Sequence, residues 1–169
     1  MTRCSFSNKS RMIIWIINHY SAPLSNSAGS SRTYDIAEGL VKLGCKVRVF
    51  SANNHEGLID KVPLDNLSRE EIVKDSFTHH YVRTRNGKNG NFGKLCSMIS
   101  FRNNVIKLGK SIEEHPDFVI GSSVHPFAWD AAMKLATIKK SKFIAEVRDI
   151  WPLTFVNSGR MSKWNPFVF

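Results

Sequence analysis

Three polar stretches of the sequence carry residues of the kind that line ligand sites. The first is a Ser/Gly-rich loop that contains Gly29 and Ser30 and leads into Arg32. The second holds His125, and the third holds Asp149. A loop that opens a helix offers free backbone N–H groups and partial positive charge, so an anion placed against Gly29 would be stabilised.

The loop at Gly29 lies inside a strand–loop–helix–strand pattern. An apolar run at 12–17 precedes it, a helix-like segment at 32–43 follows it, and 47–50 is a second apolar run. Gly44 is suited to end the helix, because glycine readily adopts the left-handed conformation. Continuous β-branched runs indicate strands covered on both faces, as in a parallel sheet. The pattern predicts a βαβ unit whose loop lies at the carboxyl end of the first strand, where open α/β sheets bind ligands.

The remainder of the chain predicts more elements of the same kind. A short helix is expected at 68–73, where serine and glutamate at a spacing of three fit a capping box. Residues 85–93 are predicted to form a loop that is not a P-loop, since Lys88 and Leu95 occupy two of the positions that motif needs. Further strands are predicted at 77–82, 117–121 and 142–147, and further helices at 95–112 and 126–139.

These elements predict an α/β domain with a Rossmann-like parallel sheet and helices on both faces. The turns after the first, fourth and fifth apolar strands then gather at one edge of the sheet, so Gly29, His125 and Asp149 should lie together there. Each residue also has a structural interpretation. His125 is placed to cap a helix, and Asp149 is placed to pair with Arg148 or with a backbone N–H.

Two other patterns also have a functional and a structural interpretation. His79 and His80 are neighbours on a predicted strand, so their rings point to opposite faces and we expect no metal site there. The predicted helix 95–112 has a wide apolar side that contains Arg102 and is flanked by two lysines. We interpret it as a core helix whose Arg102 reaches the rim, and the alternative is a helix that lies on a membrane surface.

The chain is strongly basic, with 24 Lys and Arg against 14 Asp and Glu and a formal net charge of +10. This charge favours anionic partners, but the basic residues are scattered and form no nucleic-acid-binding motif. Cys4, Cys45 and Cys96 have no metal-binding spacing, which indicates free thiols in a reducing compartment. The apolar run at 12–17 is far shorter than the roughly 20 residues that span a bilayer. We therefore expect a cytoplasmic protein, peripheral at most on the inner face of the membrane.

Several of these stretches together resemble the N-terminal domain of glycosyltransferase family 4, in particular bacterial amino-sugar transferases similar to the L-fucosamine transferases. The resemblance rests on the residues at 28–40, 43–47, 122–127 and 146–152, whose order and spacing match across essentially the whole chain. It implies the GT-B architecture, in which two Rossmann-like halves face each other across a cleft. Members of the family transfer a sugar from a nucleotide-diphosphate donor with retention of configuration, without a required metal or other cofactor.

The resemblance also implies roles for single residues. The N-terminal half mainly holds the acceptor, here expected to be a lipid-linked saccharide of surface polysaccharide or lipopolysaccharide synthesis. Gly29 and Ser30 would approach the donor diphosphate, with Arg32 as a further candidate near the phosphates. His125 would touch the transferred sugar, and Asp149 would help shape the acceptor side. His125 and Asp149 are thus the candidate catalytic residues.

The family's second domain, which carries the nucleotide-sugar pocket and a pair of glutamates, has no counterpart in these 169 residues. We therefore expect residues 1–169 to be the N-terminal half of a longer protein, without transferase activity alone. Asn165 and Pro166 look like the start of a helix and support that expectation. The alternative function is a nucleotide- or dinucleotide-binding Rossmann module, although Gly29 is the single glycine of the loop where GxGxxG needs three.

Overall fold

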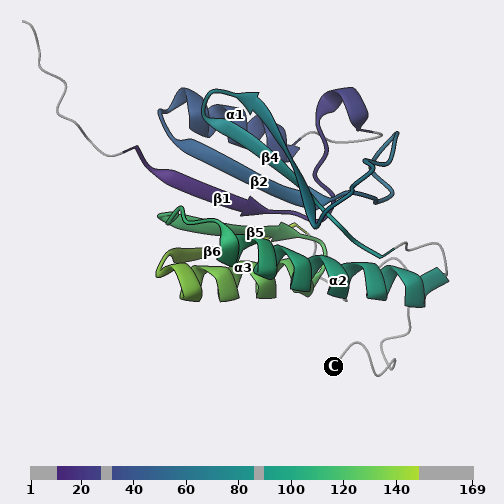
Figure 1. Cartoon of the computed structure of the whole chain (residues 1–169). Helices are drawn as coiled ribbons and strands as arrows, with labels where there is room; N and C mark the ends of the chain where they lie inside the picture. The colour runs from purple at the N-terminus through teal and green to yellow at the C-terminus, as the bar shows by residue number, and fades with distance from the viewer. Residues whose placement is uncertain (1–10, 28–31, 86–89, 149–169) are drawn as a thin grey trace, which may run out of the picture.

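The computed structural model describes residues 11–27, 32–85 and 90–148. Within these residues a six-stranded sheet has the order β3-β4-β2-β1-β5-β6, and every neighbouring pair is parallel except β3 and β4 (Figure 1). The strands are β1 (Ile13–Ile17), β2 (Lys46–Ala52), β3 (Ser68–Lys74), β4 (Phe77–Val82), β5 (Phe118–Ser123) and β6 (Lys142–Val147). The helices are the 3-10 helix η1 (Leu24–Asn26), α1 (Arg32–Lys42), α2 (Gly90–Ser111) and α3 (Pro126–Lys139). The predicted Rossmann-like α/β sheet is confirmed.

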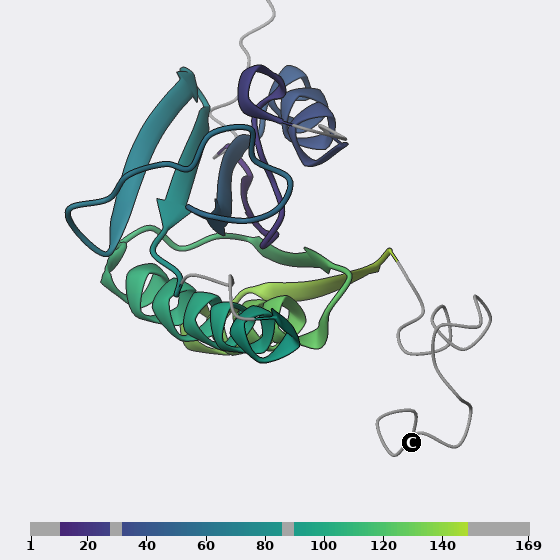
Figure 2. The same ribbon diagram turned by 90° about the vertical axis from the view of Figure 1, so that its right-hand side faces the viewer.

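Helices cover both faces of the sheet, as the sequence predicts (Figures 1 and 2). Helix α1 packs on one face, where Tyr34 and Ala37 meet the apolar side chains of β1, β2 and β4. Helices α2 and α3 pack together on the opposite face, around the fully buried Trp15 and Phe50. The connections β1–α1–β2 and β5–α3–β6 run in opposite directions from the centre of the sheet. Right-handed crossovers therefore place their helices on opposite faces.

Residues 68–73, predicted as a short helix, form strand β3 instead. The strand pairs antiparallel with β4, with Glu70 opposite His80 and a register shift between Ile72 and Lys74. The helix prediction from the capping box is wrong because backbone pairing with β4 outweighs the local helix preference, which is worth a few tenths of a kcal/mol per residue. Residues 90–93, predicted as the end of a loop, belong instead to α2, which begins at Gly90.

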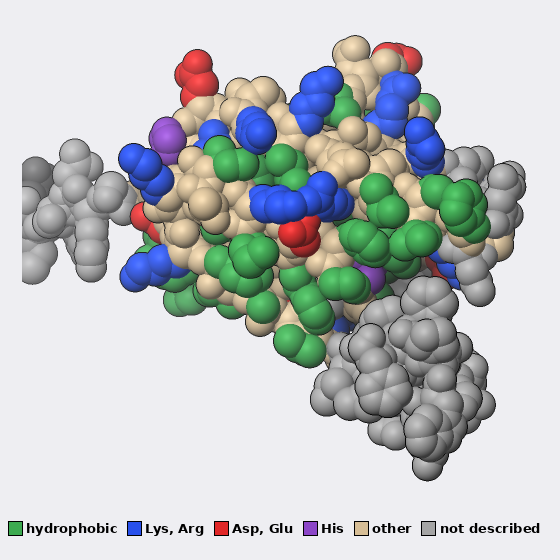
Figure 3. All heavy atoms as spheres, turned by 90° about the horizontal axis from the view of Figure 1, so that it is seen from below, with side chains coloured by type: hydrophobic (Ala, Val, Ile, Leu, Met, Phe, Trp, Pro, Cys, Tyr) green, Lys and Arg blue, Asp and Glu red, His purple; other side chains and the backbone are tan. Residues whose placement is uncertain are grey.

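Helix α2 is a core helix, in line with the preferred interpretation of its sequence. Phe101 and Val105 are fully buried, and Arg102 forms an ion pair with Asp130 of α3 at 2.5 Å. Leu95 and Ile99 were expected on the buried side, but their side chains are 41% and 39% exposed. Figure 3 shows the face that carries α2 and α3, where hydrophobic side chains surround a central group of basic and acidic ones. In the part of the chain that the structure describes, no helix is both long and apolar enough to cross a membrane.

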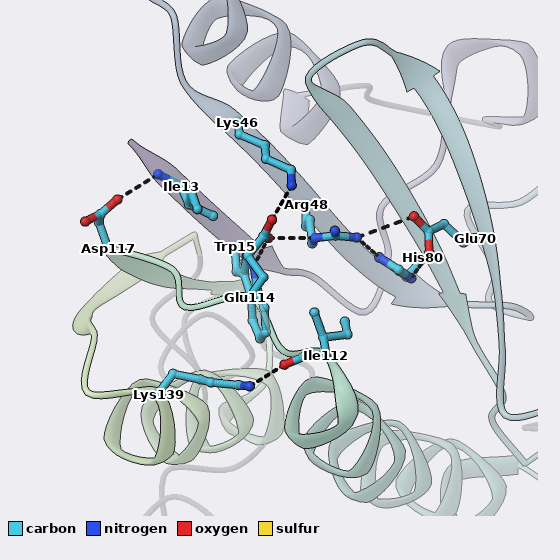
Figure 4. A network of polar contacts seen from close by, with 10 residues as sticks. All are labelled: Ile13, Trp15, Lys46, Arg48, Glu70, His80, Ile112, Glu114, Asp117 and Lys139. Carbon is cyan, nitrogen blue, oxygen red and sulfur yellow. Dashed lines mark hydrogen bonds and ion pairs between the residues drawn. The ribbon is translucent and has the colours of Figure 1, made fainter. Parts of the chain in front are cut away.

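A network of charges ties the amino ends of the central strands together (Figure 4). Glu114, in the loop before β5, accepts hydrogen bonds from Trp15 Nε1 at 3.0 Å and Arg48 Nε at 2.7 Å, and it pairs with Lys46. Burial acts to raise the pKa of Glu114, but the hydrogen bonds from Arg48, Lys46 and Trp15 outweigh it and lower that pKa to about 2. The loop after α2 is thereby fixed to β1 and β2.

Close contact between β5 and α3 depends on Gly121. An ideal Cβ at this position would lie 3.0 Å from the Trp129 Cα and 3.0 Å from the Ala132 Cβ. Gly121→Ala is expected to destabilise the protein by about 1–3 kcal/mol, because α3 must move off the sheet. Urea unfolding followed by circular dichroism measures the change. In Gly39→Ala, the control, the new Cβ meets no atom within 4 Å, and the helix should gain up to about 1 kcal/mol. Equal unfolding midpoints for Gly121→Ala and the parent chain would contradict this packing.

Candidate functional site

The carboxyl edge of the parallel sheet brings together the segments that follow β1, β2 and β5. Strand β1 lies between β2 and β5, and the strand order reverses there. Such a reversal separates the loops on its two sides and opens a crevice in which α/β proteins bind ligands. Asn18 organises the start of this region. Its side chain donates to Thr33 Oγ1 at 2.7 Å and accepts from the Tyr20 backbone N–H at 3.0 Å, which joins the end of β1 to the first turn of α1.

Four rings form an imidazole–tyrosine cluster at this edge, composed of His19, Tyr20, His55 and His125. The ring centroid of His125 lies 5.1 Å from that of His19 and 5.7 Å from that of Tyr20. The ring of His55 lies 5.6 Å from that of Tyr20, perpendicular to it. The cluster joins residues after β1, β2 and β5, with Tyr20 in contact with all three imidazoles.

The imidazoles of the cluster are neutral at pH 7. Burial lowers the pKa of both His55 and His125 to about 4, and it lowers the pKa of His19 well below its ordinary value. The tautomer of His55 is fixed, since Nδ1 accepts from the Gly57 N–H at 3.1 Å and Nε2 donates to the Ser21 carbonyl at 3.2 Å. A neutral imidazole presents one donor and one acceptor, and this combination suits hydroxyl groups better than anions.

His125 occupies the N-cap position of α3, immediately before Pro126. Its side chain makes no capping hydrogen bond, so the capping interpretation of this residue is wrong. The ring is turned toward the cluster and is 5% exposed. Beside it, His19 Nδ1 and Ser21 Oγ are buried without a hydrogen-bond partner among the described residues. Buried polar atoms of this kind are uncommon and are typical of places where water or a ligand binds.

A second polar group lies at the same edge, between the first turn of α1 and the end of β6. Arg32 donates to Glu146 Oε1 from Nη2 at 2.6 Å and from Nε at 3.0 Å. Burial acts to raise the pKa of Glu146, but the hydrogen bonds from Ser122 and Arg32 outweigh it, so the pKa is lowered. A pocket of about 190 Å³ adjoins this pair and is lined by Ile16, Thr33, Ile36, Ile120, Ile144 and Glu146.

The predicted site residues can be placed only in part. Gly29, Ser30 and Asp149 lie outside the described residues. Arg32 and His125 both lie at the carboxyl edge, Arg32 with Glu146 and His125 within the cluster. Asn18 connects the two groups through Thr33 on one side and the Tyr20 N–H on the other. In the described ranges no three His, Cys, Asp or Glu side chains are arranged to hold a metal ion.

Sequence reasoning missed His19, Tyr20 and His55. A signal was available for all three, because they follow the ends of β1 and β2, as His125 follows β5. The rule that selected His125 therefore also applies to them. His79 and His80 behave as the alternation along a strand predicts. The ring of His79 contacts Tyr34 on the α1 side, and that of His80 stacks on Phe50 on the other side.

Five histidines with lowered pKa values make folding sensitive to acid. Burial is the main reason that the pKa is lowered for each of them: to about 3 for His79, to about 4 for His55, His80 and His125, and well below the ordinary value for His19. The stability that the neutral forms provide is complete above about pH 6.5 and is lost as pH falls toward the folded pKa values. Each histidine should reduce the free energy of unfolding by about 1.4 kcal/mol per pH unit in that interval.

Urea unfolding at pH 7.5, 6.5 and 5.5, followed by tryptophan fluorescence, tests this expectation. The midpoint should fall steeply between pH 6.5 and 5.5, and His115→Gln, which changes an exposed histidine, should give the same profile. Midpoints that stay constant from pH 7.5 to 5.5 would show that these rings accept protons in the folded state.

Comparison of the chain with protein-family models, with curated proteins and with solved structures finds no match.

Proposed function

We propose that this chain is the acceptor-side domain of a retaining GT-B glycosyltransferase, which transfers a sugar from a nucleotide-diphosphate donor to a lipid-linked saccharide in surface polysaccharide synthesis. The observation that carries the proposal is the imidazole–tyrosine cluster around His125 at the carboxyl edge of the sheet. This edge is where the resemblance places the residues that meet the sugar. The donor nucleotide pocket belongs to a second domain in this proposal, so the chain alone is expected to show no transfer.

The chemistry of the cluster suits an uncharged, hydroxyl-rich ligand. A neutral imidazole can donate to one sugar hydroxyl and accept from another, and His19 Nδ1 has no hydrogen-bond partner among the described residues. Burial and the nearby Glu56 raise the pKa of Tyr20 to about 12, so its hydroxyl stays protonated and can donate. Aromatic rings also give flat apolar surfaces on which the C–H faces of a sugar can pack. His125 is the residue to which we assign contact with the transferred sugar.

The phosphates of a donor would be met at the start of α1 rather than in the cluster. Arg32 stands in the first turn of that helix, where the dipole favours negative charge. Its side chain is 58% exposed, and its ion pair with Glu146 is one that solvent weakens. An incoming diphosphate could therefore compete for the Arg32 guanidinium. Gly29 and Ser30 keep their proposed role beside the diphosphate, and Asp149 keeps its proposed role on the acceptor side.

The alternative, a dinucleotide-binding module, has less support. Such modules carry an acidic residue at the end of the second strand, which binds the ribose hydroxyls. Here that position holds Asn53, and its side chain is already engaged with the Val62 carbonyl at 2.9 Å and the Thr84 N–H at 3.0 Å. The glycine fingerprint also needs a tight turn between β1 and α1, whereas residues 18–31 separate them and include η1.

Peripheral contact with an anionic membrane is a further part of the proposal. Phe92, Leu95 and Ile99 form an apolar stripe along the first half of α2, and Phe92 is 74% exposed. Exposed Lys107 and Lys110 follow on the same helix, and the whole chain carries a formal charge of +10. An apolar stripe with basic neighbours suits an acidic lipid surface.

Vesicle co-sedimentation tests this part of the proposal. The chain should sediment with vesicles of phosphatidylglycerol and phosphatidylcholine and stay in solution with phosphatidylcholine alone. Phe92→Ser should reduce binding about fivefold or more, and Lys107→Gln with Lys110→Gln should do the same, because each removes apolar or charge attraction. Ile72→Ser changes an equally exposed apolar residue on β3 and is the control. Equal sedimentation of all variants would exclude α2 as the contact.

Binding of saccharides tests the central proposal. N-acetylated amino-sugar monosaccharides and disaccharides, titrated into the labelled chain, should shift the nuclear magnetic resonance signals of Tyr20, His55 and His125. His125→Ala should weaken that binding about tenfold, the loss expected for one buried hydrogen bond. His115→Ala serves as the control on an exposed histidine. Shifts at the ends of β1 and β2 caused by NAD, with none caused by any saccharide, would favour the dinucleotide alternative instead.

A further inference from the structure

The two edge strands of the sheet differ in how they meet solvent. Strand β3 exposes Arg69, Glu70 and Glu71 and has a register shift before Lys74, features that prevent one sheet edge from pairing with another. Strand β6 has no register shift, and its charged residues, Lys142 and Glu146, lie near its two ends. Phe143 is 37% exposed, Ile144 is 42% exposed and Val147 is 58% exposed, and β6 pairs with β5 in register along its whole length. An open apolar edge of this kind is suited to receive another strand.

The backbone of β6 determines which residues can bind such a strand. The Lys142 N–H donates to the Asp117 carbonyl at 2.9 Å, on the β5 side. In a parallel ladder the backbone groups of alternate residues face the same neighbour. Ile144 and Glu146 therefore also direct their N–H and C=O groups to β5, whereas Phe143, Ala145 and Val147 direct theirs to the open side. None of the strands in the described part of the chain pairs with that side.

We propose that β6 pairs antiparallel with β6 of a second copy of this chain, about a twofold axis at Ile144. Phe143 then lies opposite Ala145 of the second copy, and these two residues exchange both backbone hydrogen bonds through groups that point outward in the single chain. Ile144 faces Ile144 of the second copy in a pair without hydrogen bonds, where side chains approach most closely. The sequence of β6 therefore complements itself, and the partner of the strand is β6 of a second copy.

Charge complementarity selects this register. Lys142, whose Nζ lies 5.6 Å from the Phe118 ring centroid, and Glu146, which binds Arg32, lie on the α1 side of the sheet. With the axis at Ile144, each Lys142 lies opposite Glu146 of the other copy, which gives two cross-strand ion pairs. An axis at Ala145 would instead place Lys142 opposite Arg148, and an axis at Phe143 would leave Lys142 opposite Ile144. An axis between two residues would not align the outward backbone groups.

The apolar side chains agree with the same arrangement. On the α2 and α3 side, the large Phe143 lies beside the small Ala145 of the other copy, so the two can pack without collision. On the α1 side, the two Ile144 side chains contact each other, and each also lines the pocket of its own copy. The pairing thus covers apolar surface on both faces and satisfies backbone groups that would otherwise need water.

Charge reversal tests the pairing on the intact chain. The parent chain should sediment as a dimer in analytical ultracentrifugation. Lys142→Glu should raise the dimer dissociation constant about tenfold or more, because it places glutamate opposite Glu146 twice. Lys142→Glu combined with Glu146→Lys should restore dimerisation, since the charges oppose each other again. Lys107→Glu, the same charge change on α2, should leave the dimer intact. A monomeric parent chain, or a dimer indifferent to Lys142→Glu, would overturn the proposal.

A cysteine cross-link tests the register itself. Ile144→Cys should form a disulfide-linked dimer under mild oxidation on a non-reducing gel, because the two Cβ atoms of a directly opposed pair without hydrogen bonds lie close enough to bridge. Ile72→Cys, on the protected edge strand, should not exceed the background of the parent chain. Cross-linking of Ile72→Cys alone would place the contact at the other edge and reject this interface.

Discussion

The structure depends on one topological constraint, the reversal of strand order at β1. Strand β2 and strand β5 lie on opposite sides of β1, and crossovers of the same hand place α1 on one face and α2 and α3 on the other. The reversal keeps the segments after β1 and β5 from being covered by a common helix. It also brings His19, Tyr20 and His125 together at the carboxyl edge of the sheet. On the face that carries α1, none of the described helices covers β5 and β6. Ile144 on β6 is therefore exposed to solvent.

The two ends of the sheet use polar groups in different ways. At the amino end, Glu114 is bound by Trp15, Arg48 and Lys46, and this network connects three segments of the backbone. Its charges are compensated within the protein, so it holds the strands in place without offering a site to a ligand. At the carboxyl end, beside the Arg32–Glu146 ion pair, lie neutral rings with hydrogen-bonding capacity that the described residues do not fully use, as at His19 Nδ1. In the proposed function, rigidity at the amino end would support ligand recognition at the carboxyl end.

Periodic segments of the sequence were enough to predict most of the fold. The apolar runs that became β1, β2 and β4, and the helices that became α1 and α3, carry their signals locally. Gly44 ends α1 with φ 88°, as its sequence position predicts. Strand β3 could not be recognised in the same way, because its polar residues become a strand through pairing with β4. The partial exposure of Leu95 and Ile99 was also beyond the pattern, since it depends on how far α3 covers α2.

The site was predicted less completely than the fold. His125 was found because a strand signal and Pro126 mark its position at the edge of the sheet. His19 and Tyr20 were missed because the Ser/Gly-rich loop further along the same connection carries the stronger local signal for an anion site. His55 also follows the end of a strand, but it lies in a long polar connection in which no periodicity marks one residue. What joins these side chains is the strand order, and that order becomes visible only when the sheet is assembled.

The proposed pairing through β6 and the proposed membrane contact are compatible because of the symmetry of antiparallel strands. A twofold axis at Ile144 runs perpendicular to the sheet, so it keeps the α2 and α3 layers of both copies on the same side. The apolar stripes at Phe92, Leu95 and Ile99 of two copies would then face one plane, and two weak contacts would act together on a single membrane. The carboxyl edges of the two sheets point in opposite directions within that plane. Each imidazole–tyrosine cluster therefore stays clear of the other copy.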